Sequence, residues 1–198
     1  YFHHVLKRIA DSMKLVDSLW ILDRDGRAIA SSNLYPIPAS LDLTDRDYFR
    51  AHIDHPIGRF VGNVLTPRTI TDPPSVPFFA VSERRPSADG SFAGVIEVSV
   101  APSAIEEYYR RIGGRPGDYF AILRPDGGVL ARYPKPATAA SEAETQLSDA
   151  LRFDGSLTTG VSSIDGLERR IGVRRVAGYP VVVSAGIETA AIRAHWLS

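Results

Sequence analysis

The feature that most constrains the fold is a duplicated strand–turn–strand pattern. Residues 18–31 contain two apolar runs on either side of a turn at Asp25-Gly26. The pattern returns about 100 residues later, at residues 119–132, with its turn at Asp126-Gly127. Asp-Gly between apolar runs indicates a β-hairpin, because glycine accepts the positive φ that a tight turn demands. The chain of 198 residues is therefore predicted to contain two lobes of one design.

Further strand patterns complete a sheet in each half of the chain. They lie at residues 77–84 and 92–100 in the first half, and at 156–164, 169–176 and 179–187 in the second. Short turns join successive runs, which favours antiparallel pairing. We predict an α+β fold in which a long N-terminal helix precedes two lobes, each an antiparallel sheet flanked by helices.

The N-terminal helix is predicted over residues 1–17. Its apolar residues follow a heptad spacing on one face: Phe2, Leu6, Ile9, Met13 and Val16. This stripe must pack either on the sheet of its own lobe or on a second subunit, and two heptads leave both options open. The seam predicts a homodimer through this helix.

A second helix is expected after Thr44, which can cap it with Asp47 three residues on. On such a helix Tyr48, Phe49 and His52 share roughly one face. Residues 56–77 are rich in Pro, Thr and Gly, which predicts a long loop with at most one edge strand. Loops of this length in a compact domain are usually functional.

The order of these elements resembles the double Cache family of extracytoplasmic sensors, which consist of tandem PAS-like lobes. The resemblance covers essentially the whole chain. It is carried by Leu43-Thr44-Asp45-Arg46-Asp47-Tyr48-Phe49, by the hairpin at residues 89–99, and in the second lobe by Asp126-Gly127 with Leu130-Ala131-Arg132-Tyr133-Pro134.

The resemblance implies a periplasmic domain of an inner-membrane protein, anchored by two flanking transmembrane helices. Its output would be a cytoplasmic histidine kinase, a diguanylate cyclase or a chemotaxis module. The implied layout is an N-terminal helix (1–17), a membrane-distal, ligand-binding PAS-like lobe (18–101), a linking helix and loop (102–117), a membrane-proximal PAS-like lobe (118–190) and a segment leading to the second transmembrane helix (191–198).

Strand alternation selects the pocket face of residues 92–100. Gly94, Ile96, Val98 and Val100 form a wholly apolar set that should face the N-terminal helix, so Glu97 and Ser99 face the other way. Buried polar side chains need partners, and an arginine of the neighbouring strand, Arg84 or Arg85, is expected to approach Glu97. The alternative is a surface ion pair at the edge of the sheet.

The resemblance also assigns the pocket helix. Amino-acid-binding members place an arginine and two aromatic residues there, and Arg46 matches the arginine, while Tyr48 and Phe49 stand where tryptophan and tyrosine are usual. Ser99 replaces the aspartate that binds an amino group, which favours a small carboxylate or another anion over an amino acid. Arg68 could add a second arm. The predicted ligand-binding residues are Arg46, Tyr48, Phe49, His52, Arg68, Phe79, Ser82, Arg84, Glu97 and Ser99.

Composition and motifs exclude several function classes. The 23 basic and 23 acidic residues balance, so no electrostatic case for nucleic acid arises. Cysteine is absent, and no hydrolase, phosphate-loop or dinucleotide motif is present, so neither a cofactor nor catalysis is predicted. His52 and His55 lack further ligands at metal-binding spacing. Two alternatives stay open: a periplasmic protein-interaction or adhesion module, and, least favoured, a hydrolase using His52 with Ser82 or Ser99.

Overall fold

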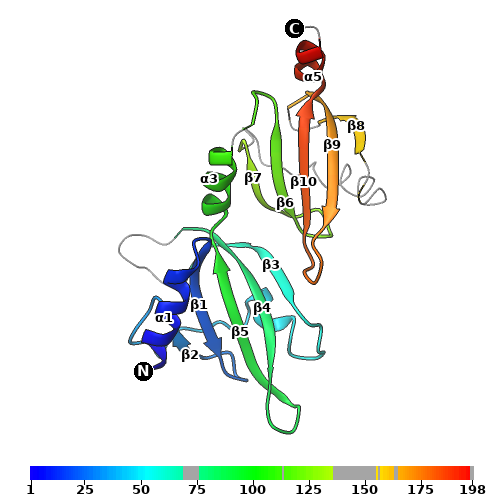
Figure 1. Ribbon diagram of the computed structural model, residues 1–198. Helices are drawn as coiled ribbons and strands as arrows, with labels where there is room; N and C mark the ends of the chain where they lie inside the picture. The colour runs from blue at the N-terminus through cyan, green and yellow to red at the C-terminus, as the bar shows by residue number, and fades with distance from the viewer. Residues whose placement is uncertain (69–75, 113, 136–154, 156, 163–164, 197–198) are drawn as a thin grey trace. The chain divides into compact units, whose positions relative to one another are not determined.

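The computed structural model describes residues 1–68, 76–112, 114–135, 155, 157–162 and 165–196, and it divides into two compact units, Tyr1–Ala104 and Ile105–Ser198. The first unit begins with α1 (Phe2–Ser12) and contains β1 (Val16–Leu22), β2 (Ala28–Ser31), α2 (Asp47–Arg50), β3 (Phe60–Leu65), β4 (Phe78–Pro86) and β5 (Phe92–Val100) (Figure 1). Helix α3 (Pro102–Ile112) spans the boundary between the units.

The second unit repeats the strand plan of the first. It contains β6 (Tyr119–Leu123), β7 (Val129–Tyr133), β8 (Leu157–Val161), β9 (Glu168–Arg175), β10 (Val182–Glu188) and the helix α5 (Thr189–Trp196). The strand orders are β2-β1-β5-β4-β3 and β7-β6-β10-β9-β8, so equivalent strands occupy equivalent places in two five-stranded antiparallel sheets. This confirms the predicted α+β fold with two PAS-like lobes.

The N-terminal helix is shorter than predicted. It has 11 residues, and Met13 already has extended backbone angles. Val16 lies in β1 and pairs with Val100 of β5. The heptad spacing continues through Val16, but its β-branched side chain suits a strand. Pairing with β5 gives this part of the backbone the hydrogen bonds that a longer helix would otherwise provide.

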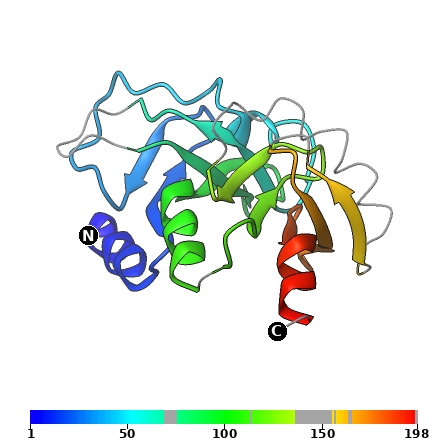
Figure 2. The same cartoon turned by 90° about the horizontal axis from the view of Figure 1, so that it is seen from above.

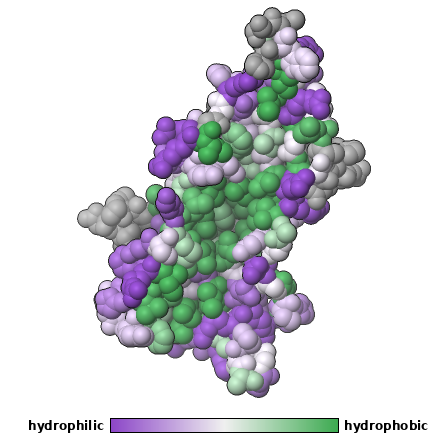
Figure 3. Space-filling model, in the orientation of Figure 1, coloured by the Kyte–Doolittle hydropathy of each residue, from purple (hydrophilic) through white to green (hydrophobic). Residues whose placement is uncertain are grey.

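The two faces of the first sheet are covered differently. Helix α1 packs on β1 and β2, and the chain between β2 and β3 lies on the other side, as Figure 2 shows. The apolar set of β5, Gly94, Ile96, Val98 and Val100, was expected to face the N-terminal helix. Ile96 is instead exposed. Figure 3 shows apolar side chains over the strands of this unit on the face that Figure 1 presents.

The core of the first unit lies between its sheet and the chain from Leu41 to Arg50, and consists of Trp20, Leu22, Leu43, Tyr48, Phe49, Phe78, Ala80 and Val95. Helix α2 has only four residues, and Arg46 rather than Thr44 occupies its N-cap position. The Thr44 hydroxyl donates to the Asp42 carboxylate instead, and Asp47 accepts the backbone N–H of Asn63 at 2.7 Å. The predicted capping box is therefore wrong, because these side chains tie α2 to the loop before it and to β3.

Candidate ligand-binding site

A cavity of about 40 Å³ lies in the first unit, between the sheet and the chain around α2. By the usual volume of a buried water, it has room for about three water-sized groups. Strands β1 and β5 form its floor, and the segments on either side of β3 form its walls. The lining residues are Asp17, Ser18, Trp20, Asn33, Leu41, Leu43, Arg46, Tyr48, Pro67, Arg68, Phe78, Glu97 and Ser99.

Glu97 is the central polar group of the floor. It is 1% exposed, lies opposite Trp20 on β1 and Ser82 on β4, and accepts a hydrogen bond from the Ser99 hydroxyl at 2.8 Å. Burial raises the pKa of Glu97 to about 8, and the nearby Asp17 carboxylate acts in the same direction. At neutral pH Glu97 is therefore mostly a neutral carboxylic acid, which can donate a hydrogen bond.

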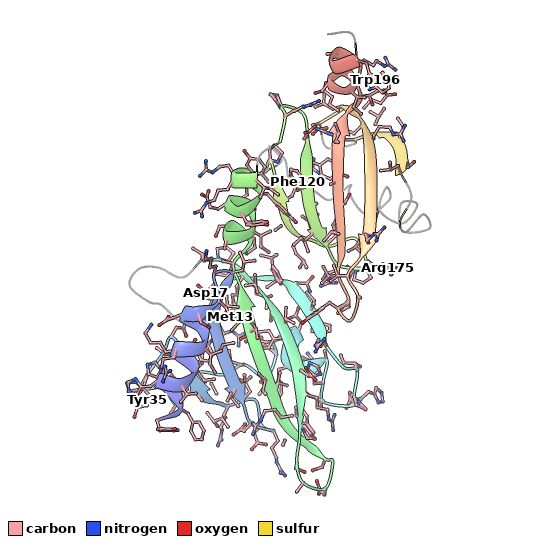
Figure 4. All side chains as sticks on the ribbon, viewed as in Figure 1. Met13, Asp17, Tyr35, Phe120, Arg175 and Trp196 are labelled. Atoms are coloured by element: carbon pink, nitrogen blue, oxygen red, sulfur yellow. The ribbon has the colours of Figure 1, made fainter. Side chains whose placement is uncertain are left out.

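Asp17, near the start of β1, is labelled in Figure 4. It follows Val16 in the strand and lines the cavity beside Ser18. Ser18 lies opposite Ser99 on β5, and its hydroxyl accepts the indole N–H of Trp20 at 3.0 Å. This bond satisfies the indole N–H at the cavity wall.

The arginines belong to the walls of the cavity. A terminal nitrogen of Arg46 donates to the Thr66 carbonyl at 2.9 Å, while its Nε is buried and has no hydrogen-bond partner among the described residues. Arg68 is held by two acceptors, the Asp45 carboxylate and the Asp42 carbonyl. Arg46 thus keeps a free donor beside the cavity, whereas Arg68 mainly orders the loop.

Tyr48 adds another donor. It is buried on α2, and burial raises the pKa of its phenol well above the usual range, so the hydroxyl stays protonated. Arg46, Tyr48 and Glu97 thus present N–H and O–H donors at this cavity at neutral pH, while the Asp17 carboxylate is an acceptor in the same lining.

The structure brings five of the ten predicted site residues to the cavity: Arg46, Tyr48, Arg68, Glu97 and Ser99. The other five, Phe49, His52, Phe79, Ser82 and Arg84, lie elsewhere in the first unit and do not line it. The expected approach of Arg84 or Arg85 to Glu97 is wrong, since Arg84 donates to the carbonyl of His52 at 2.7 Å and Arg85 to that of Leu22 at 2.9 Å.

His52 and Ser82 form a buried pair with a structural geometry. His52 Nε2 lies 2.9 Å from the Ser82 hydroxyl, which donates to the Tyr48 carbonyl at 3.1 Å. Because the serine proton is committed to that carbonyl, Nε2 carries the proton of the imidazole. Burial lowers the pKa of His52, so the ring is held neutral. A serine engaged in this way and lying away from the cavity is not an activated nucleophile.

The sequence reasoning missed the contributions of β1 and of the loop before α2. Asp17 was assigned to the helix, which hid the polar pair Asp17-Ser18 at the start of a strand. Trp20 alternates with Leu19 and Ile21, and only the strand order shows that it lies beside Glu97. Asn33, Leu41 and Pro67 lie in segments without periodicity, so no sequence signal marks them.

Comparison with known proteins shows which solved structures share this fold. No family model matches the sequence, and no curated protein gives a significant match. Among solved structures, the extracellular domain of rpHK1S-Z16, described as a histidine kinase, is 29% identical to this chain. That similarity covers 98% of this chain and 80% of the other, with a TM-score of 0.78. The chain has the fold of a Cache-type sensor domain.

Two chemoreceptor structures share this sensor fold at lower identity. The ligand-binding domain of the Pseudomonas aeruginosa amino acid chemoreceptor PctB, in complex with L-Arg, is 14% identical over 96% of this chain and 72% of its own, with a TM-score of 0.66. That of Pseudomonas fluorescens CtaA, in complex with L-serine, is 12% identical over 95% and 79%, with a TM-score of 0.60.

These neighbours are sensor domains and not catalytic domains, and the 29% identical one places this Cache-type domain in a context of signal transduction. Within the described ranges, no helix combines the length and the apolar character that crossing a membrane requires.

Proposed function

We propose that this Cache-type domain senses a small organic anion, with a carboxylate as the recognised group, in the cavity of its first unit. The observation that carries the proposal is the surplus of donors at the cavity. The Nε of Arg46 has no partner among the described residues, and Glu97 is protonated at neutral pH because it is buried. A carboxylate accepts hydrogen bonds only, so it satisfies both groups, and its charge balances the guanidinium.

The cavity volume supports a short ligand. About 40 Å³ suits a carboxylate with a few carbon atoms. The apolar part of such a ligand would lie against Trp20, Leu43 and Phe78, which line the same space. An amine could pair with Asp17, but it would leave the Arg46 Nε without an acceptor, and Glu97 could pair with it only by ionising in its buried position, at a cost that an anion avoids.

We further propose that the domain is extracytoplasmic and membrane-anchored, with the first unit distal, and that it relays binding to a cytoplasmic histidine kinase or similar output. Residues of the predicted seam support a homodimer through α1, because Phe2 and Ile9 remain exposed although the helix packs on its own sheet. Exposed apolar side chains on one face of a helix suit a partner helix.

The test of ligand binding is a thermal-shift screen of short organic acids, amines and amino acids at pH 7, on the wild-type chain and two variants. Arg46→Gln removes the free donor. Arg50→Gln is the matched control, since Arg50 is an exposed arginine of the same helix that does not line the cavity.

We expect organic acids to raise the Tm of the wild type and of Arg50→Gln, and to have at least tenfold lower affinity for Arg46→Gln. Stabilisation by amines alone contradicts the anion proposal. The site is contradicted if every organic acid that stabilises the wild type stabilises Arg46→Gln equally. A chain that responds to no compound in the panel would favour the alternative function, a module that binds a protein partner.

A further inference from the structure

The second unit contains a cluster of two buried arginines beside the exposed carboxylate of Asp165, and this cluster plays no part in the proposed function. Arg169 on β9 is 2% exposed, and its two terminal nitrogens donate to the two oxygens of Asp165 at 2.6 and 2.8 Å. Its Nε donates to the Gly117 carbonyl at 2.5 Å. Each nitrogen of the Arg169 guanidinium therefore has an acceptor.

Arg132 on β7 is the unmatched member of the cluster. It is 8% exposed, and its terminal nitrogen lies 3.6 Å from the Asp165 carboxylate, which is too long for a hydrogen bond. Its Nε is buried and has no hydrogen-bond partner within the described ranges. Buried charged groups are normally paired and hydrogen-bonded, so this guanidinium calls for an acceptor.

The charge of the cluster shows what kind of acceptor is missing. Among the described residues, the charged groups that act on Arg132 are Asp165 and the like-charged Arg169, which makes two guanidinium groups against one carboxylate. Both guanidinium groups lie over the ring of Tyr119, at 4.5 and 5.4 Å from its centroid. A ring contact lowers the cost of burying a cation, but it satisfies no N–H.

The duplicated topology places Arg132 on the cavity side of its sheet. In the first sheet, Trp20 pairs with both Ser31 and Glu97, and Trp20 and Glu97 line the ligand cavity. In the second sheet the equivalent row is Arg132, Ala121 and Ser184, because Ala121 pairs with the other two. All three are buried. Arg132 thus stands in the row that faces the ligand in the other copy.

We propose that the second unit holds its own anion site, in which Arg132 binds a small monocarboxylate. One negative charge removes the excess positive charge of the cluster. The Nε and the adjacent terminal nitrogen of a guanidinium form a planar fork that matches the two oxygens of a carboxylate. This site is separate from the cavity of the first unit and does not depend on that cavity binding a ligand.

The experiment titrates sodium acetate into the full chain carrying Arg46→Gln, which lacks the proposed donor of the first unit, at constant ionic strength and with calorimetric detection. Sodium chloride is the comparison anion. The site variants are Arg132→Met and Arg132→Lys, made in the same background. Arg170→Gln is the matched control, because Arg170 is the exposed neighbour of Arg169 on β9.

We expect one acetate to bind per chain, at least tenfold more tightly than chloride. Arg132→Met should abolish this binding and still fold without anion, since replacing an uncompensated buried charge with an apolar side chain of similar length is seldom destabilising. Arg132→Lys keeps the charge but loses the fork, so its acetate affinity should fall at least tenfold, and it serves as the test if the methionine variant does not fold. Arg170→Gln should bind as its parent does.

Absence of acetate binding in the Arg46→Gln background, equal affinity for chloride, or binding unaffected by both changes at Arg132 would each overturn this site. A first-unit screen that fails while acetate still binds here would overturn the proposed function and leave this proposal standing.

Discussion

Replacement of Glu97 by glutamine should stabilise the first unit at neutral and alkaline pH. The carboxyl is buried at the cavity floor, and its pKa rises from 4.5 to about 8 on folding, mainly through loss of solvent. Between these values the folded state binds one proton more than the unfolded state, so stability falls as pH rises. Glutamine has nearly the same shape as the protonated acid and does not titrate.

The magnitude follows from the two pKa values. Each pKa unit corresponds to about 1.4 kcal/mol. Ionisation of Glu97 in the unfolded chain therefore lowers the free energy of unfolding by about 3 kcal/mol at pH 7 and by about 5 kcal/mol above pH 8. Glu97→Gln should therefore be about 3 kcal/mol more stable than wild type at pH 7 and similar to it below pH 4.5. Its stability should change much less between pH 5 and 8.

Urea unfolding followed by tryptophan fluorescence measures the stability of the first unit, which contains Glu97. Of the two tryptophans, Trp20 is 9% exposed in the first unit while Trp196 is 85% exposed, so the fluorescence change on unfolding comes mainly from Trp20. The control is Glu83→Gln, which removes an exposed carboxylate from β4 of the same sheet. If wild type and Glu97→Gln show the same dependence on pH, the reasoning about burial at the cavity floor is refuted.

Three further changes test other parts of the first unit. Gly94→Ala should lower stability by about 2 kcal/mol or more in urea unfolding, because Gly94 has φ +118° and an added Cβ would lie 2.0 Å from the Leu22 carbonyl oxygen. His52→Ala should cost about 2–4 kcal/mol through the cavity and the lost bond to Ser82, yet leave organic-acid affinity unchanged; a large loss of affinity would contradict its structural role. Ile9→Glu should shift sedimentation toward monomer without unfolding the chain, and equal self-association in both proteins would exclude α1 as the interface.

The sheets could be predicted from the sequence because the signals behind them are local and repeated. Two Asp-Gly turns between apolar runs, each followed by further alternating strands, leave few ways to pair. The length of α1 could not be predicted, because Val16 satisfies both a heptad position and the first position of a strand. Only its pairing with Val100 decides between them, and that partner lies far along the chain.

Strand alternation also located the polar floor of the cavity. Glu97 and Ser99 were assigned to one face of β5 by parity alone, and both line the cavity. Parity does not say how far along a strand the cavity extends, so Ser82, which pairs with Glu97, was assigned to the site although its hydroxyl is occupied by Tyr48 and His52. Side chains that satisfy each other in this way can be recognised only from coordinates.

Comparison of the two sheets shows why a shared fold leaves the ligand open. Backbone pairing fixes which positions face inward, and these positions are the same in both copies: Trp20 with its partners in one, Ala121 with its partners in the other. The side chains at these positions differ in charge and size. The first copy places a buried acid in the row, at Glu97, and the second places a buried guanidinium, at Arg132. Two rows with the same backbone pairing within one chain can therefore differ in chemistry, so fold similarity to amino acid receptors does not transfer their ligands. The substitutions at Arg46, Glu97 and Arg132 act on the residues that set that chemistry.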